Sequence, residues 1–311
     1  MLKIKNTSWL VIACLILFSS CRQASKSDDV LKVGVMSSMD FVPLAVAREK
    51  GLFDKHQVKV DIQKFYSAND RDAAFQSGNI DGTVIDYTGA VLQKAGGIDL
   101  KITSACNAPF CIMTGPESYI YKVEDLQGKK IAVSRNTVID FCVETALMSV
   151  EVPVQQIEKQ EINKIPIRLE MMLNGQTDAT ALPDPFISIA QSRGARTIVC
   201  MNDLGYATTG IVFKTQTIEE KSEQLKAFYL AYNEAVEYIK SHTIEDIREI
   251  LINDIGFPPP LVNSVVLPDY TAAAMPSEKD IQATVDWLKA KSLVSDEFTA
   301  TDLLDNRFIT Q

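Results

Sequence analysis

The strongest constraint on the fold is a regular alternation of strand-like and helix-like segments that starts at residue 31. The strand-like segments are short and apolar, or alternate apolar with polar residues, and they cover residues 31–36, 58–62, 82–86 and 100–104. The helix-like segments between them are closed by the glycines Gly51, Gly78 and Gly96. Strands that alternate with helices in this way predict a largely parallel sheet with helices on its faces.

A second unit with the same alternation follows. Its strand-like segments cover residues 130–134, 178–182 and 197–200, and its helix-like segments cover residues 138–149, 167–174 and 186–193. The rest of the chain is different, because helical spacing of apolar residues dominates over residues 224–242, 244–255 and 277–288. The predicted fold class is therefore α/β, with two sheet-containing units in 311 residues.

The amino terminus is a separate segment with the pattern of an export signal. Lys3 and Lys5 precede an apolar run over residues 9–18, and two serines then precede Cys21. The run is too short for a membrane-spanning helix, which needs about 20 apolar residues.

Cys21 sharpens this interpretation, because a cysteine at the end of such a run resembles the lipobox of bacterial lipoproteins. The resemblance implies that residues 1–20 are removed, that Cys21 is lipidated, and that residues 21–29 form a flexible tether. The alternatives are an ordinary signal peptide cut near Ala24, or an uncleaved anchor. Removal of the signal changes the formal net charge from −9 to −11, because it takes away two lysines and no acid.

The composition excludes several classes of function. A chain with 40 acidic and 31 basic residues lacks the basic face that nucleic acid requires. Only two histidines are present, so a His-rich metal cage is excluded, and we predict no metal site and no cofactor. No G-x-S-x-G, P-loop or G-x-G-x-x-G motif occurs, and His56 and Cys142 are more simply a surface residue and a buried thiol. We therefore predict no catalytic residue.

Polar residues gather where the predicted strands end and helices begin. Parallel α/β sheets bind ligands beyond the carboxyl ends of their strands, where helix starts offer free N–H groups. Any one of these residues could be a simple helix cap, and the prediction depends on all of them meeting in one cleft. The candidate ligand-binding residues at these ends are Ser38, Asp40, Phe41, Ser67, Asn69, Asp86, Tyr87, Thr88, Ser134, Asn136, Thr137 and Asp184.

Several motifs resemble the type 2 solute-binding proteins of ABC importers, in the branch that serves nitrate, sulfonates and the thiamine pyrimidine precursor. They are Leu31-Lys-Val-Gly-Val, the run PLAVAREKGLF over residues 43–53, FQSGNIDG over 75–82, DLQGKKIAV over 125–133, LNGQTDA over 173–179 and WLKAKSLV over 287–294. The resemblance spans residues 30–311 and is specific for the fold and the transport role. It does not identify the solute.

The resemblance implies two α/β lobes joined by two strands that act as a hinge. Carried onto this chain, lobe one is residues 30–105 plus 207–311, and lobe two is residues 106–206, with Asn107 a further ligand-binding candidate at the first crossing. It also implies a lipid-anchored monomer in the cell envelope, facing the periplasm or the cell exterior, whose partners are an ABC permease and its ATPase. An enzyme or a sensory receptor on the same fold is the alternative of another class.

Two expectations depend on this layout. Four cysteines follow Cys21 and allow three pairings; Cys106 and Cys111 would lie at the first crossing, where a disulfide would stiffen the hinge, although buried free thiols are the alternative. For the solute, the strand ends offer one cation, Arg135, against three acids, Asp40, Asp86 and Asp184. This balance favours an aminopyrimidine over a sulfonate or nitrate. The aromatic side chains of four residues could stack on its flat ring, or could instead pack between the lobes: Phe41, Tyr87, Phe110 and Tyr206.

Overall fold

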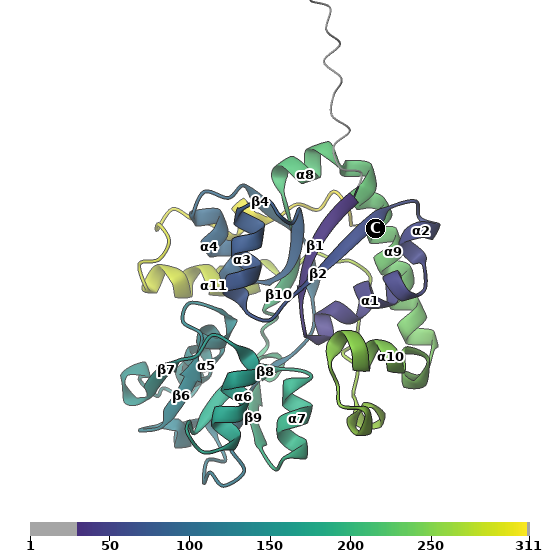
Figure 1. Ribbon diagram of the computed structural model, residues 1–311. Helices are drawn as coiled ribbons and strands as arrows, with labels where there is room; N and C mark the ends of the chain where they lie inside the picture. Colours follow the sequence, from purple (N-terminus) through teal and green to yellow (C-terminus); the bar gives the residue numbers. More distant parts are fainter. Residues whose placement is uncertain (1–29, 310–311) are drawn as a thin grey trace, which may run out of the picture.

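The computed structural model describes residues 30–309, which form two lobes that each contain a five-stranded sheet (Figure 1). The predicted export signal, the predicted lipidation site Cys21 and the predicted tether of residues 21–29 lie outside the described residues. None of the helices within residues 30–309 is long and apolar enough to cross a membrane.

The sheet of the first lobe combines strands from distant parts of the chain. Its order is β2 (Lys59–Phe65), β1 (Val30–Met36), β3 (Gly82–Asp86), β10 (Thr209–Lys214) and β4 (Leu100–Cys106). β1 is parallel to β2 and β3, whereas β10 is antiparallel to both of its neighbours. The sheet is therefore parallel except for the one strand that arrives from the other lobe.

The sheet of the second lobe repeats this arrangement. Its order is β7 (Glu158–Glu161), β6 (Lys130–Val133), β8 (Ala179–Pro183), β5 (Phe110–Thr114) and β9 (Arg196–Cys200). Here β6 is parallel to β7 and β8, and β5 is antiparallel to β8 and β9. In both sheets the antiparallel strand is the first strand after a crossing between the lobes, so it enters the sheet from the opposite end.

Helices cover both sheets. The α-helices are α1 (Val42–Glu49), α2 (Leu52–Lys55), α3 (Ala68–Gln76), α4 (Tyr87–Ala95), α5 (Val138–Ser149), α6 (Ile165–Leu173), α7 (Phe186–Ser192), α8 (Thr215–Glu220), α9 (Ser222–Ser241), α10 (Arg248–Ile250) and α11 (Glu278–Ala290). Short 3₁₀ segments are η1 (Met39–Phe41), η2 (Val123–Leu126), η3 (Val154–Gln156), η4 (Met201–Leu204), η5 (Ile244–Ile247), η7 (Pro259–Ser264) and η8 (Ala300–Leu303). Although α8, α9 and α11 follow the second crossing, they pack with the first lobe (Figure 1).

The predicted α/β fold class with two lobes is confirmed, and most elements lie within a few residues of the predicted ranges. The strands β5, β7 and β10 were not recognised from their own sequence pattern. The predicted single helix over residues 244–255 is wrong, because η5, α10 and a π-helical segment (Leu251–Ile255) share this range. The left-handed Gly256 lets its own N–H and that of Phe257 reach the Leu251 carbonyl, which widens the last turn.

Of the two alternatives for Cys106, the disulfide to Cys111 is wrong and the buried free thiol is correct. Cys111 is bonded to Cys200, because β5 and β9 are neighbours and their register sets these two residues opposite each other. Cys106 ends β4 on the first lobe and is a buried free thiol, as is Cys142 in α5. The disulfide therefore lies wholly within the second lobe and does not lock the crossing.

Candidate functional site

A small cavity of about 60 Å³ lies between the two lobes and is lined by both. The first lobe contributes Met36, Ser37, Ser38, Asp40, Ala68, Arg71, Val84, Ile85, Asp86 and Thr209. The second lobe contributes Phe110, Ser134, Thr137, Val138, Ile139, Asn163, Ile165, Arg168 and Pro183. Carboxyl ends of parallel strands from both sheets thus meet at one place, as expected for this class of fold.

Helix starts form part of the cavity wall. Ser67 caps α3 by accepting the N–H of Asp70, and Thr137 caps α5 by accepting the N–H of Ile139. The first residues of α3, α5 and α6 line the cavity itself, namely Ala68, Val138 and Ile165. The positive ends of these helix dipoles therefore favour a negatively charged group between the lobes.

Arg71 is a buried cation in the wall, but its charge is compensated within the first lobe. Its guanidinium bonds Asp86 at 3.1 Å and Asp72 at 2.8 Å. Burial raises the pKa of Asp86, yet Arg71, the Thr88 hydroxyl and the Gly89 N–H outweigh burial and hold the pKa below its usual value. Arg71 and Asp86 thus form an ion pair that leaves little charge for a solute.

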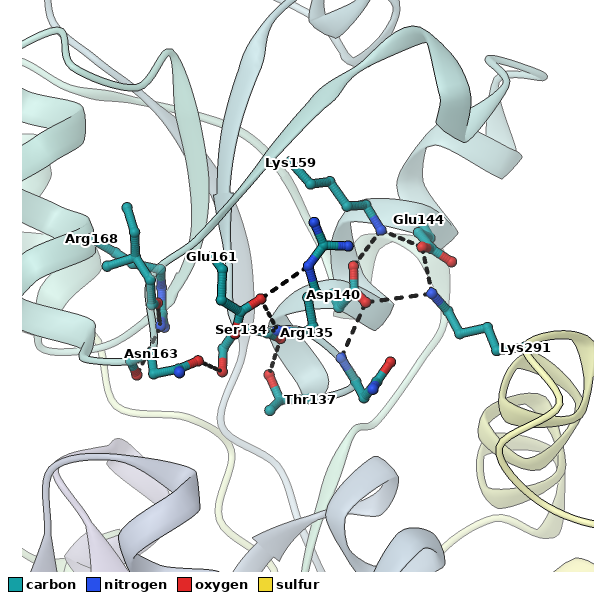
Figure 2. Close-up of polar contacts among 12 residues, drawn as sticks. Ser134, Arg135, Thr137, Asp140, Glu144, Lys159, Glu161, Asn163, Arg168 and Lys291 are labelled. Atoms are coloured by element: carbon teal, nitrogen blue, oxygen red, sulfur yellow. Dashed lines mark hydrogen bonds and ion pairs between the residues drawn. The ribbon is translucent and has the colours of Figure 1, made fainter.

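Arg168 is a buried cation of a different kind. Only 1% of the residue is exposed, its Nη1 donates to the carbonyl oxygens of Ile162 and Asn163, and its Nε has no hydrogen-bond partner among residues 30–309. Burial lowers the pKa of Arg168 to about 10, with Glu161 opposing the shift, so the guanidinium stays charged at neutral pH. Glu161 itself is bonded to Arg135 at 3.2 Å, so Arg168 faces the cavity without a bonded counter-ion from the described residues (Figure 2).

Asn163 connects this cation to the opposite side of the second-lobe wall. The Ser134 hydroxyl donates to Asn163 Oδ1 at 2.8 Å, and the Thr137 hydroxyl donates to the Ser134 carbonyl (Figure 2). Because Arg168 also bonds the Asn163 carbonyl, these residues hold one another in fixed positions. The second lobe thus presents a prearranged polar surface around Arg168, which has no bonded counter-ion within residues 30–309.

Asp40 lies where the cavity meets the first crossing. Its Oδ1 accepts the N–H of Ala108 at 2.9 Å, which ties lobe one to the segment that leads into lobe two. Burial raises the pKa of Asp40 to about 6, although the bond from Ala108 opposes the rise. Near neutral pH this carboxylate is therefore ionised but poorly solvated.

We expect Asp40 to lower the free energy of unfolding of the wild type by about 1.5 kcal/mol between pH 5 and pH 8, and we expect this decrease to be absent in Asp40→Asn. The folded-state pKa of about 6 lies above the ordinary value of 3.8, so the folded state holds the proton more tightly. The contribution of Asp40 is thus full below pH 3.8 and is lost as the pH rises through about 6. Urea unfolding of both proteins at the two pH values measures the difference; parallel pH profiles would contradict the assignment.

The predicted site residues are distributed over several places. Five line the cavity: Ser38, Asp40, Asp86, Ser134 and Thr137. Ser67 and Thr88 lie beside it as a helix cap and as the donor to Asp86, whereas Phe41 and Tyr87 are buried in the hydrophobic core. Asn69 and Asn136 line a separate pocket with Arg135, and Asn107 and Asp184 line another at the crossings, together with Tyr206.

Sequence reasoning missed the two cations that reach the cavity. It counted Arg135, which lines the neighbouring pocket instead, and overlooked Arg71 and Arg168 because both lie inside helices and not at strand ends. A signal for Arg168 was present, since it shares one helical face with Ile165, Leu169 and Met172, all of which are buried. A charged residue on such a face must find a compensating group or a ligand.

The fold of residues 30–309 is that of the two-lobed periplasmic binding proteins. The alkanesulfonate-binding protein SsuA from Xanthomonas axonopodis pv. citri, bound to MOPS, superposes with a TM-score of 0.78 at 19% identity, over 89% of this chain and 98% of that chain. The periplasmic nitrate-binding protein NrtA from Synechocystis PCC 6803 superposes with a TM-score of 0.72 at 14% identity, over 86% and 83%.

The same architecture also carries an enzyme. The desulfurization enzyme DSZB has a TM-score of 0.68 and 12% identity, over 90% of this chain and 97% of that chain. At identities this low the superpositions show the fold alone. A comparison with curated protein sequences finds no significant match.

Family membership rests on the sequence. Residues 38–245 match the family model described as NMT1/THI5 like, so the chain belongs to that family. The matched range begins after β1 and contains the other four strands of the first sheet, the whole second lobe and both crossings. The resemblance drawn from the motifs is thereby confirmed.

Proposed function

We propose that this protein is an extracytoplasmic solute receptor that captures a small anion between its lobes and delivers it to an ABC permease and ATPase. The observation that carries the proposal is Arg168, a buried guanidinium that lines the interlobe cavity without a bonded counter-ion among the described residues. A buried charge is costly unless it is paired, so a protein retains it where a ligand supplies the opposite charge. The helix starts in the wall add to the same positive potential.

The walls indicate what the anion carries besides its charge. Apolar side chains from both lobes surround the polar groups, including Met36, Val84, Phe110, Val138 and Ile165. A short alkyl group would fill such a surface, whereas nitrate would leave it without contacts. A short-chain alkyl sulfonate is therefore our first candidate, and the ligands named for the alkanesulfonate-binding and nitrate-binding structures support an anion.

The thiamine-precursor-like pyrimidine becomes the second candidate. The sequence favours it because acids outnumber cations at the strand ends, but Asp86 is bonded to Arg71 and Asp184 lines another pocket. The aromatic residues Phe41 and Tyr87, considered for ring stacking, are core residues. Among the four aromatic candidates, Phe110 alone lines the cavity.

Isothermal titration calorimetry with ethanesulfonate, nitrate and an aminopyrimidine tests the proposal. We expect ethanesulfonate to bind tightest and to raise the melting temperature by mass action. Tighter binding of the aminopyrimidine would overturn the anion assignment. Release of sulfite from ethanesulfonate by the purified protein would favour an enzyme, which together with a sensory receptor is the alternative of another class on this fold.

Lipid anchoring at Cys21 is a separate proposal, supported by the sequence pattern alone. We expect the protein to sediment with membranes in a bacterial host, and Cys21→Ser to release it or leave the signal uncleaved. Mass spectrometry of the mature amino terminus measures the lipid directly; an unmodified terminus near Ala24 would show an ordinary signal peptide.

A further inference from the structure

The two lobes meet at a second place, away from the crossings of the chain. Lys291 follows α11 of the first lobe and extends toward α5 of the second lobe, where it meets Asp140 and Glu144 (Figure 2). Trp287 lies one turn earlier, on α11. We call Asp140, Glu144, Lys159, Trp287 and Lys291 the interlobe clasp.

The contacts across the clasp are direct. Lys291 Nζ lies 2.7 Å from Glu144 Oε1 and 3.4 Å from Asp140 Oδ2, and the Trp287 indole N–H donates to Glu144 Oε2 at 2.7 Å. The Trp287 ring also packs edge-on against Phe141 of α5, at 5.5 Å between centroids. Ion pairs, a hydrogen bond and an aromatic contact therefore join the two lobes at this place.

The charges of the clasp balance only when the lobes are together. Asp140 and Glu144 are both acidic and largely buried, and within the second lobe both are bonded to the single cation Lys159. Lys291 brings the second positive charge from the first lobe. Separation of α11 from α5 would leave two adjacent carboxylates on one lysine, which disfavours the separated arrangement.

The clasp is connected to the solute cavity through α5. The first turn of this helix contributes Val138 and Ile139 to the cavity wall, and Asp140 follows immediately. Asp140 Oδ2 also accepts the N–H of Asn136, beside the cavity residue Thr137. The helix α5 thus carries cavity-lining residues in its first turn, and the next turns carry the acids that bind the residues of the clasp on the first lobe.

We propose that Lys291 and Trp287 are positioning residues for the solute cavity, which hold the second-lobe wall against the first lobe through Asp140 and Glu144. The inference rests on the proposed solute-binding function, because it assigns a regulator of lobe closure to that same cavity. Neither residue lines the cavity. Their effect on affinity comes from the population of the closed arrangement.

The test replaces Lys291 by methionine, which keeps the aliphatic length and removes the charge. Lys289→Met, in the last turn of α11, is the matched control, since no ion pair of the clasp includes it. We expect Lys291→Met to weaken ethanesulfonate binding at least about fivefold, Lys291→Arg to restore it, and Lys289→Met to leave it unchanged. Equal affinity of the wild type and Lys291→Met would overturn the proposal.

A measurement without ligand separates this inference from the choice of solute. Small-angle X-ray scattering of the ligand-free proteins should give a larger radius of gyration for Lys291→Met than for wild type and Lys289→Met. The chain has two tryptophans, Trp9 and Trp287, so Trp9→Phe leaves the clasp indole as the sole tryptophan, whose emission is followed by selective excitation of indole over tyrosine. Its emission should shift to longer wavelength in Lys291→Met; an unchanged radius and emission would refute the clasp even if ethanesulfonate proves the wrong solute.

Discussion

Replacing Arg168 by methionine is expected to weaken ethanesulfonate binding about 300-fold while the protein remains folded. The guanidinium lines the cavity, is buried, and has no bonded counter-ion within residues 30–309. Removing one partner of a buried charge pair costs about 2–5 kcal/mol of binding free energy, and 3.4 kcal/mol is about 300-fold. The loss should appear in the dissociation rate more than in the association rate.

The free energy of unfolding of ligand-free Arg168→Met is expected to change little. The variant no longer buries a charge, and the lowered pKa of about 10 against 12.5 indicates a cost of about 3 kcal/mol for keeping that charge. It also loses the bonds to the Ile162 and Asn163 carbonyls, which costs about 1–3 kcal/mol. These two effects oppose each other, so a loss of affinity would not be explained by unfolding.

Arg193→Met is the matched control for this experiment. Arg193 is half exposed at the end of α7 and bonds Glu170 on the surface, so its removal should leave affinity and stability nearly unchanged. Calorimetry and urea unfolding of the three proteins separate binding from folding. Affinity of Arg168→Met within threefold of wild type would show that the solute is held by other groups.

Loss of the Cys111–Cys200 disulfide is expected to lower the free energy of unfolding by about 4 kcal/mol. The two cysteines are 89 residues apart, so the bond removes much of the conformational freedom of the unfolded second lobe. It also joins β5, which begins just after the first crossing, to β9, which leads through η4 to the second. We therefore expect the second lobe to unfold first in its absence.

Urea unfolding with and without reductant, in wild type and in a Cys111→Ala, Cys200→Ala variant, measures this contribution. Reductant should shift the midpoint of the wild type downward and leave the double variant unaffected, because Cys106 and Cys142 are already free thiols. A wild-type midpoint that does not respond to complete reduction would show that the loop is held by packing alone.

The part of the fold that the sequence predicts consists of the elements with a clear local pattern of apolar and polar residues. Strand and helix periodicity identified β1, β2, β3 and β4 and the helices α1, α3 and α4 between them, because each repeats a spacing that a few neighbouring residues display; the short α2 was taken for a turn. The strand β10 was not predicted, because it is defined by its pairing with β3 and β4, which are distant from it in sequence. β7 escaped too, because its sequence Glu-Lys-Gln-Glu lies at the polar edge of its sheet.

In the candidate site too, the residues with a local signal were predictable and those placed by tertiary structure were not. Ser38, Asp86 and Thr137 were found because caps and strand ends are local features, and the fold class places such ends at one edge of a sheet. Asp184 ends a strand as well, yet it lines the pocket at the crossings and accepts bonds from Ser188. Pro183 of the same strand lines the cavity, so the turn that follows it, which no short sequence window shows, places Asp184 in the other pocket.

The sequence by itself determined the α/β class, the division into two sheet-containing units and the family, and it predicted that several strand-end residues meet in one cleft. Each depends on spacing within about ten residues, or on motifs that survive as continuous runs. Only the tertiary structure decided which cysteines are bonded, which arginines reach the cavity and which lysine joins the lobes. Those pairings connect residues tens to more than a hundred positions apart, such as Glu144 with Lys291, and they depend on strand register and helix packing.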